Sequence, residues 1–231
     1  MHEAKVPKGG SKARSFQSDI GRVLTRRFGA FLVTGSGVDR WLLTHDRATL
    51  ASMPNYRRAW VPGGTYFFTV NLLERDRWLL IEHIDSLRNA FRIARAARDF
   101  EIIAIAILPD HLHCVWRLPA GDADNATRWR HIKASFARSL PRDERRSARR
   151  VAKTERGIWQ RRYWEHLVRD ERDLMTHVDY IHYNPVKHGH ATRVREWPYS
   201  SFHRFVRDGL LPEDWSDRAS SSNTFGERAA G

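Results

Sequence analysis

The stretch that most constrains this chain is residues 107–118, ILPDHLHCVWRL, in which polar and apolar residues alternate after a Pro-Asp turn. Side chains alternate between the two faces of a β-strand. The pattern therefore predicts a strand with one apolar face and an opposite face that carries His111 and His113 side by side. Two neutral imidazoles fixed towards one point can bind a divalent metal ion. Two solvent-facing histidines on an edge strand would give the same pattern.

Four further segments surround this strand in an order typical of one α+β fold. Residues 65–71, rich in β-branched and aromatic residues, predict a strand, and residues 101–107 predict a buried strand that pairs antiparallel with the histidine strand. Apolar residues at helical spacing predict helices over 84–98 and 125–140. With one more strand, this order gives a ferredoxin-like α+β sandwich, an antiparallel sheet with helices on one face.

The chain is strongly basic, with 40 Lys and Arg against 27 Asp and Glu and a formal net charge of +13. A charge of this sign and size indicates a polyanionic partner such as nucleic acid. The single cysteine, Cys114, excludes an internal disulfide and a cysteine-based zinc module. No apolar run approaches the roughly 18 residues needed to span a bilayer, so no membrane partner is expected.

Composition divides the chain into three parts. Residues 1–52 carry scattered glycines and basic residues without a long periodic pattern, and we expect a flexible extension there. Met53 opens a much more coherent stretch, so we expect one domain over residues 53–216, with the natural start of translation at Met53. The Ser-, Arg- and Gly-rich residues 217–231 predict a disordered tail.

The segment ERDLMTHVDYIHYN at residues 171–184 predicts a third helix. Tyr180 and Asn184 are four residues apart and share one face of it. Pro185 disfavours the helical conformation of the residue before it, so we expect the helix to end at Asn184. Tyr180 could be a packed tyrosine, and Asn184 could cap the helix. Further histidines are expected at the surface or against phosphates: His177, His182, His188 and His190.

Two segments have features of a nucleic-acid surface. Residues 142–156 carry seven basic and three acidic residues and fit either a solvated linker or a DNA-phosphate contact. In GIWQRRYWEHLVRD, aromatic residues and arginines are interleaved, which suits base stacking and phosphate pairing, while the two tryptophans could equally belong to a core. The predicted DNA-binding residues are Arg57, Arg58, Arg128, Arg130, Lys133, Arg161, Arg162, Trp164, Arg169 and Lys187.

Four sequence blocks follow one another in the 53–216 domain: YRRAWVPGGTYFFTVNL, LPDHLHCVW, IWQRRYWEHLVRD and HVDYIHYNPVKHG. In this order they resemble the REP-associated tyrosine transposases, a bacterial branch of the single-tyrosine HUH transposases, in which U is a hydrophobic residue. The resemblance implies an HUH endonuclease fold, a divalent ion (magnesium or manganese), and action on single-stranded DNA hairpins at repetitive extragenic palindromes. It also implies a monomer in the bacterial cytoplasm, associated with the nucleoid through DNA.

The resemblance further assigns roles to four residues. His111 and His113 match the metal ligands, and Asn184 matches the position whose amide completes the metal site. Tyr180 matches the nucleophile, although Tyr183, three residues on, could attack in its place by exposure alone.

The function implied is nicking and strand transfer of single-stranded DNA. Attack of Tyr180 on a phosphodiester would expel a 3′-hydroxyl and leave a 5′-phosphotyrosine, which a second 3′-hydroxyl could reverse without ATP. Two other functions stay open. One is a palindrome-binding protein without turnover, and the other is a metal-dependent nuclease that uses activated water and would keep cleaving after Tyr180→Phe.

Overall fold

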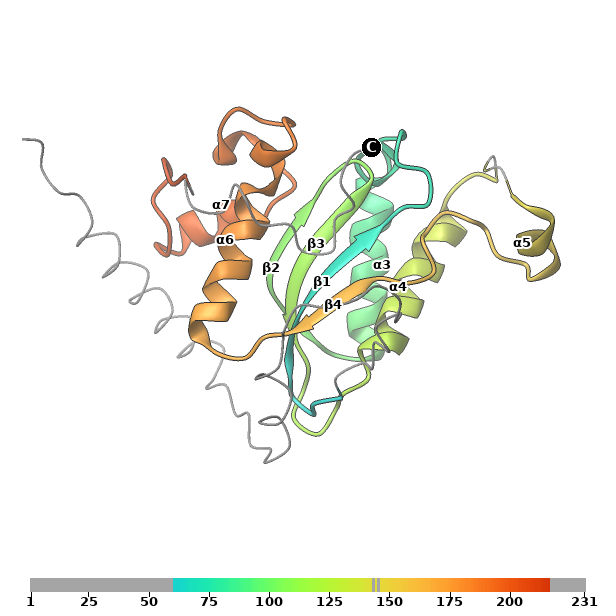
Figure 1. Ribbon diagram of the computed structural model, residues 1–231, viewed down its shortest axis with the longest axis horizontal. Coiled ribbons are helices and arrows are strands. Elements are labelled where there is room, and N and C mark those ends of the chain that lie inside the picture. The colour runs from blue at the N-terminus through green and yellow to red at the C-terminus, as the bar shows by residue number, and fades with distance from the viewer. Residues whose placement is uncertain (1–59, 143, 145, 217–231) are drawn as a thin grey trace, which may run out of the picture.

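The computed structural model of the protein describes residues 60–142, 144 and 146–216. The expected extension over residues 1–52, its translation start and the expected tail over residues 217–231 lie outside the described residues. Within them, helices pack on both faces of one antiparallel sheet (Figure 1).

The sheet contains four strands in the order β2-β3-β1-β4. Their bounds are β1 (Thr65–Asn71), β2 (Glu101–Ile107), β3 (His111–Arg117) and β4 (Trp164–Leu167). Every neighbouring pair is antiparallel, which is the ferredoxin-like arrangement. The predicted α+β fold is confirmed, including its fourth strand. Since β3 lies inside the sheet, the alternative of two histidines on an edge strand is excluded.

Helices separate β1 from β2 and β3 from β4, and the remaining helices follow β4. The helices are α2 (Leu79–Glu82), α3 (Ile84–Ala97), α4 (Asn125–Ser139), the short α5 (Ala148–Ala152), α6 (Glu171–Lys187), a 3₁₀ turn (Val194–Glu196) and α7 (Phe202–Arg207). The helices predicted over 84–98 and 125–140 agree with α3 and α4 to within one residue at each end. None of these described helices is both long enough and apolar enough to cross a bilayer.

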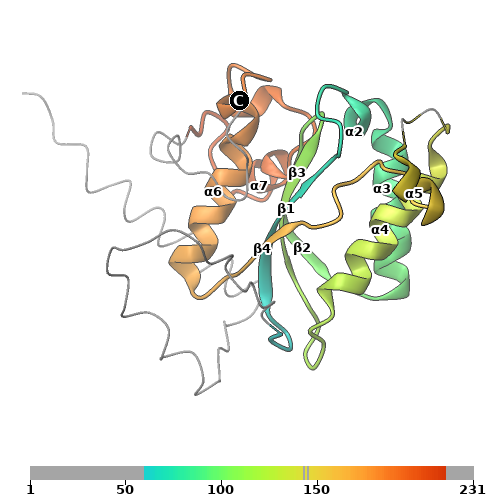
Figure 2. The same ribbon diagram turned by 45° about the vertical axis from the view of Figure 1, so that its right-hand side comes forward.

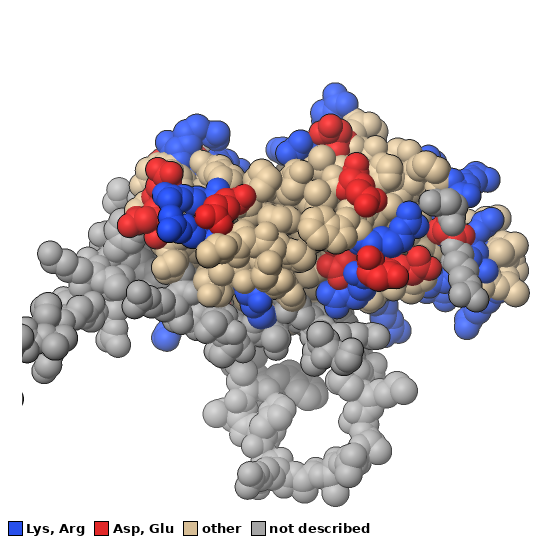
Figure 3. Space-filling view, turned by 90° about the horizontal axis from the view of Figure 1, so that it is seen from above, with Lys and Arg blue, Asp and Glu red and all other residues tan. Residues whose placement is uncertain are grey.

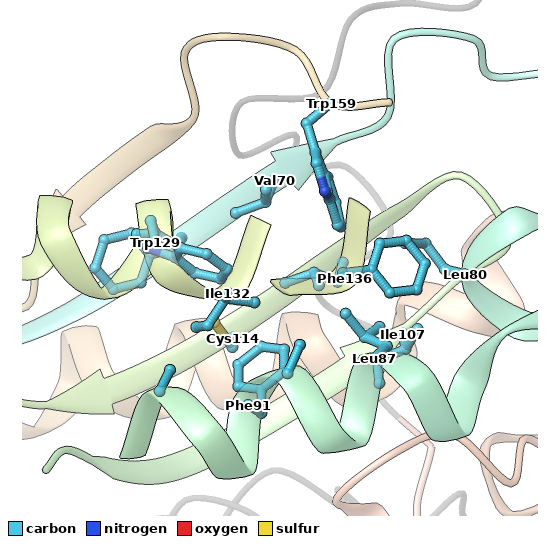
Figure 4. Close-up of a cluster of buried hydrophobic side chains, with 14 of the residues drawn as sticks. Val70, Leu80, Leu87, Phe91, Ile107, Cys114, Trp129, Ile132, Phe136 and Trp159 are labelled. Atoms are coloured by element: carbon cyan, nitrogen blue, oxygen red, sulfur yellow. The ribbon is translucent and has the colours of Figure 1, made fainter. Parts of the chain in front are cut away.

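Each face of the sheet has its own hydrophobic core. On one face, α3 and α4 pack over the apolar side of β3, with Phe91 and Ile132 close to Cys114 (Figure 4). The Trp116 and Trp129 rings stack in this core with centroids 4.5 Å apart. On the other face, α6 and α7 cover the sheet (Figure 2). Phe67 and Val115 belong to the core on that face. The expectation of helices on one face is therefore wrong in that part. The chain after β4 folds back over the second face, so the histidine side of β3 is buried as well.

Helix α6 continues past the end that Pro185 predicts. It runs to Lys187 with Pro185 inside it, and the backbone of His188 still donates to the carbonyl of Asn184 at 3.0 Å. A proline in a helix removes one backbone hydrogen bond, but here Asn184 and Pro185 are both buried residues of α6. Gly189, with φ of +71°, then ends the helix in the left-handed conformation. The added turn carries Lys187 towards Tyr180.

His182 lies on the buried side of α6, although the sequence predicts it at the surface. Its Nε2 is 2.9 Å from Ser201 Oγ, and its ring lies 4.7 Å from that of Phe205. Burial is the main cause that lowers the pKa of His182 to about 3, and the positive charge of Arg204 adds to it. The folded protein therefore keeps this imidazole neutral in mild acid.

We expect mild acid to destabilise the protein through His182. His182 takes up a proton near pH 6.5 in the unfolded chain but only near pH 3 in the folded chain. The free energy of unfolding therefore decreases as the pH is lowered through this window. Between pH 7 and 5 the contribution is about 2 kcal/mol, which His182→Gln should remove. Urea unfolding at both pH values measures it. His131→Gln, at an exposed histidine of α4, should keep the wild-type loss.

Candidate active site

His111 and His113 form a buried pair on the face of β3 that α6 covers. Their exposed fractions are 1% and 0%, and their ring centroids are 4.9 Å apart. Every second residue of a strand lies on the same face. Because α6 covers this face of β3, both polar residues are buried. The structure thus brings the predicted pair together in a site shielded from bulk water.

The ring of His111 is held by the residue before it. Asp110 Oδ1 lies 2.7 Å from His111 Nδ1, and Arg75 donates to the other oxygen of the same carboxylate. Burial alone would raise the pKa of Asp110, but the hydrogen bonds from His111 and Arg75, together with the positive charge of Arg75, outweigh it and lower that pKa to about 2. With Nδ1 engaged by a carboxylate, the lone pair lies on His111 Nε2. That atom is buried and has no hydrogen-bond partner among the described residues.

The ring of His113 is held across the sheet. Thr69 lies opposite it in the β1–β3 register, and Thr69 Oγ1 is 2.9 Å from His113 Nδ1. Metal-binding histidines usually have one ring nitrogen fixed in this way, which leaves the other for the ion. Sequence reasoning missed both Thr69 and Asp110. Asp110 directly precedes the pair and could have been suspected, whereas the role of Thr69 depends on strand register.

The ring of Tyr180 lies against the histidine pair from α6. Its centroid is 5.2 Å from that of His113, and Tyr180 is 1% exposed. Lys187 places its Nζ 3.4 Å from the phenol oxygen and 4.8 Å from the ring centroid. Asn184, fully buried, lies one turn after Tyr180 on the same helix. A phenol, an ammonium group and an amide therefore share the stretch of α6 that faces β3.

Tyr183, the alternative nucleophile, has different neighbours. It is half-buried and lines a separate cavity together with Val186, Val194 and Trp215. The ring of Tyr180, by contrast, packs against His113 of the pair.

Further basic residues lie beside His111. Arg75 contacts Asp110 beside His111, and the exposed His188, which follows the last residue of α6, has its ring centroid 5.1 Å from that of His111. Together with Lys187, these groups suit an anionic ligand such as a phosphate. Sequence reasoning left His188 among the surface histidines, because its approach to His111 depends on the extra turn of α6.

Comparison with known proteins identifies the kind of protein that carries this site. The sequence profile of the family described as "Transposase IS200 like" matches residues 64–184, which include both histidines and Tyr180. The chain is 48% identical to a putative REP-associated tyrosine transposase of Haemophilus influenzae over 164 residues, which cover 71% of this chain and 93% of that one. The chain belongs to the REP-associated tyrosine transposase family.

Two more relatives agree with this assignment. The transposase is 45% identical to the REP-associated tyrosine transposase of Escherichia coli over 164 residues, 71% of this chain and 92% of that one. It also matches a solved structure described as a REP-associated tyrosine transposase bound to a REP hairpin, with a TM-score of 0.67 and 44% identity over 78% of this chain and 100% of that one. The predicted family, fold and enzyme class are confirmed.

Arg128 of the transposase is buried, and the prediction that it is exposed for DNA is wrong. It is 1% exposed, and its guanidinium donates to the backbone oxygen of Asp99 at 3.0 Å and to Asp122 at 2.8 Å. A buried charge held by several acceptors cannot turn towards a phosphate without leaving them unpaired. Helical spacing could not reveal this, since the acceptors come from loops outside α4.

The other predicted DNA-binding residues divide by exposure. Arg57 and Arg58 lie outside the described residues. The exposed arginines are Arg130, Arg161, Arg162 and Arg169. Three residues are half-buried: Lys133, Trp164 and Lys187. Of these, Lys133 donates to the carbonyl of Gln160 at 3.0 Å, and Trp164 packs edge-on against Phe67 at 5.6 Å, so both also support the fold.

A second cluster of potential metal ligands lies at the start of α6. His166, Asp173 and His177 each offer one ligand atom, and these atoms lie within 4.8 Å of one another, an arrangement compatible with a divalent ion. The sequence places His177 at the surface, which is wrong, because it is 1% exposed. The four-residue spacing of Asp173 and His177 was the available signal. His166 belongs to a strand whose distance from α6 only the fold determines.

Proposed function

We propose that the transposase nicks single-stranded DNA beside palindromic hairpins and rejoins it through a covalent intermediate on Tyr180. The observation that carries this proposal is the contact between Tyr180 and His113, at 5.2 Å between ring centroids. It joins a nucleophile to a buried imidazole pair, and it does so in a member of a tyrosine transposase family.

The proposed partner is a single-stranded DNA hairpin bound by one copy of the chain. The solved relative with 44% identity is described as bound to a REP hairpin, and the net charge of +13 suits a polyanion. On the face seen in Figure 3, basic and acidic side chains are mixed instead of forming one basic patch. Recognition by a few placed arginines fits this distribution. One chain supplies every proposed catalytic residue, which supports a monomer.

The proposed cofactor is a divalent ion, Mg²⁺ or Mn²⁺, which His111, His113 and Asn184 would hold. The buried lone pair of His111 Nε2 fits this role. Mg²⁺ prefers oxygen ligands, and imidazole suits Mn²⁺ better, so this donor set favours manganese. When bound, the ion would supply charge neutralisation and polarisation of the phosphodiester.

The proposed chemistry of the chain itself is a transesterification. The Tyr180 oxygen loses its proton to solvent and forms a bond to phosphorus, while the bond from phosphorus to the 3′-oxygen breaks and that oxygen takes up a proton. The ring of Tyr180 is held by its packing against His113 and Phe67, which orients the phenol. The phosphotyrosine keeps the ester bond, so a second 3′-hydroxyl can reverse the step.

Lys187 is proposed to stabilise negative charge on the Tyr180 oxygen, from which its Nζ is 3.4 Å away. Lys187→Met should slow nicking by about 10- to 100-fold, because a placed donor to a developing oxyanion is lost. Lys187→Arg keeps the cation and should recover most of the rate. Single-turnover nicking and native-gel hairpin binding measure the two effects separately. If binding weakens as much as nicking slows, Lys187 is a DNA contact only.

A labelling experiment tests the proposed function. The full chain is incubated with Mn²⁺ and a single-stranded palindrome labelled at its 3′ end, and the products are separated under denaturing conditions. A 5′-phosphotyrosine retains the 3′ label on the protein, so a labelled adduct is expected. Cleavage without an adduct would identify the water-using nuclease, and a native-gel shift without cleavage would identify a binding protein.

A further inference from the structure

A group of potential metal ligands outside the proposed active site joins the edge strand of the sheet to the start of α6. His166 lies opposite Phe67 in the β1–β4 register, so its side chain is on the face that α6 covers. Asp173 and His177 are one turn apart in the first two turns of α6. The fold therefore brings three potential ligand residues from two elements close to one point.

The contacts within this group are close to those of a coordination sphere. His166 Nε2 lies 2.8 Å from Asp173 Oδ2. His177 Nδ1 lies 3.2 Å from Asp173 Oδ1 and 2.8 Å from the backbone oxygen of Asp173. The two imidazole rings are stacked with centroids 4.8 Å apart. Ligand atoms that share one zinc ion at about 2.0–2.2 Å are about 3–3.5 Å from one another. The carboxylate already presents one oxygen to each imidazole at nearly this spacing.

Burial and charge also suit a cation. The side chains of His177 and Asp173 are 2% and 9% exposed, and His166, at 28%, leaves one opening to solvent. The Asp173 carboxylate accepts a hydrogen bond from the backbone nitrogen of Arg169 at 3.0 Å and lies 2.8 Å from His166 Nε2, contacts that suit a charged carboxylate. The group thus combines an ionised carboxylate with two imidazoles in a largely dry site.

We propose that His166, Asp173 and His177 bind a divalent transition-metal ion, Zn²⁺ in preference to Mg²⁺. Two imidazoles and one carboxylate are ordinary zinc ligands, whereas Mg²⁺ takes oxygen ligands and keeps its waters. The ion takes the place of the proton between His166 and the carboxylate and of the proton on His177 Nδ1, which now also reaches the backbone oxygen of Asp173, and both protons pass to solvent. It fastens β4 to α6, the helix that carries Tyr180 and Asn184.

This site is separate from the one around His111 and His113. Phe67 lies between the two, with its ring centroid 4.6 Å from that of His177 and 5.7 Å from that of His113. An aromatic ring offers no ligand atom, so one ion cannot be shared between the clusters. The two sites can therefore be emptied independently by substitution.

An ion at this site must displace the side chain of Arg169 from the carboxylate of Asp173. Its backbone nitrogen and its Nε lie 3.0 and 3.2 Å from Asp173 Oδ2. The side chain is 62% exposed and can turn into solvent, while Oδ1 faces His177. Without an ion, the same contacts form a hydrogen-bonded clamp between β4 and α6. The experiment has to separate that clamp from a metal site.

The test counts zinc ions bound to the full chain, first freed of metal by a chelator and then dialysed against Zn²⁺ with Mg²⁺ in excess. His111→Ala should keep one tightly bound Zn²⁺ per chain, because it damages the other site only. Adding His166→Ala should weaken this binding by at least about 100-fold, since a direct ligand matters more than the outer contacts whose loss costs 10- to 100-fold. Adding His131→Ala, on the exposed side of α4, should change nothing.

A second variant distinguishes the loss of a ligand from the loss of the fold. Circular dichroism checks that each variant is folded. His166→Cys replaces one zinc ligand by another and should retain binding. With Co²⁺ as the probe, it should add a thiolate absorption band in the near ultraviolet, since Cys114 is buried elsewhere. Zinc binding unchanged by His166→Ala, no zinc in the His111→Ala protein, or no thiolate band would each overturn the proposal. None of these results depends on whether the transposase nicks DNA.

Discussion

Tyr180→Phe is expected to abolish the covalent DNA adduct and to slow nicking by at least about 10⁴-fold, because it removes the atom that bonds to phosphorus. Phenylalanine keeps the ring that packs on His113 and Phe67, so hairpin binding and the fold should persist. Losing one buried hydroxyl should change the free energy of unfolding by about 1 kcal/mol. The 3′-labelled palindrome on denaturing gels measures the adduct, and thermal unfolding provides the control for folding.

Tyr183→Phe is the matched control. It removes a hydroxyl three residues away, from a half-buried ring that lines a different cavity, and it should leave the adduct at the wild-type level. An adduct that survives in Tyr180→Phe and disappears in Tyr183→Phe would move the nucleophile to Tyr183. Cleavage at the wild-type rate without any adduct would replace the transesterification with hydrolysis by water.

The fold was predictable because its main signals are local. Alternation along β3 separated Leu112, Cys114 and Trp116 from the histidines, and the structure places those three in the first core. Helical spacing marked α3 and α4 in the same way. Since strands and helices followed one another in a ferredoxin-like order, short-range patterns were sufficient to give the topology.

The packing of α6 over the second face of the sheet was not predictable from the same local signals. Whether α6 returns over the histidine side of β3 depends on the turn after β4 and on packing around Phe67, which no local pattern encodes. The burial of His182 and the extra helical turn after Pro185 follow from that packing. The prediction for Arg128 was wrong for a related reason, because one of its acceptors, the backbone oxygen of Asp99, lies 29 residues away in the sequence.

In the candidate site, too, local sequence patterns revealed some features and only the fold determined the others. The family motif gave His111, His113, Tyr180 and Asn184 as a set, but it could not give the groups that orient them. Asp110 and Thr69 act on the histidines through a turn and a strand register, and Lys187 reaches Tyr180 only because the helix continues. Orientation in this protein is thus a property of tertiary structure, while residue identity is visible in the sequence.

His111→Ala is expected to lower both nicking and adduct formation by about 10³-fold or more, since a metal ion's charge stabilisation is worth several kcal/mol and each 1.4 kcal/mol is tenfold in rate. It deletes the buried Nε2 that fits a metal ligand. Asp110 keeps its contact with Arg75, so the fold should survive. Single-turnover nicking across a series of Mn²⁺ concentrations measures the effect, and excess manganese should not restore the rate.

Asp110→Asn distinguishes a lost ligand from a misdirected one. The amide keeps the shape of the carboxylate but loses its charge, so His111 should bind the ion about 10- to 100-fold more weakly. More Mn²⁺ would then be needed for half-maximal nicking, while the rate at saturation stays near that of the wild type. His131→Ala, at an exposed histidine of α4, should shift neither quantity by more than about threefold. If Asp110→Asn and His111→Ala lost the same rate at saturating manganese, the carboxylate would support the fold and not the ion.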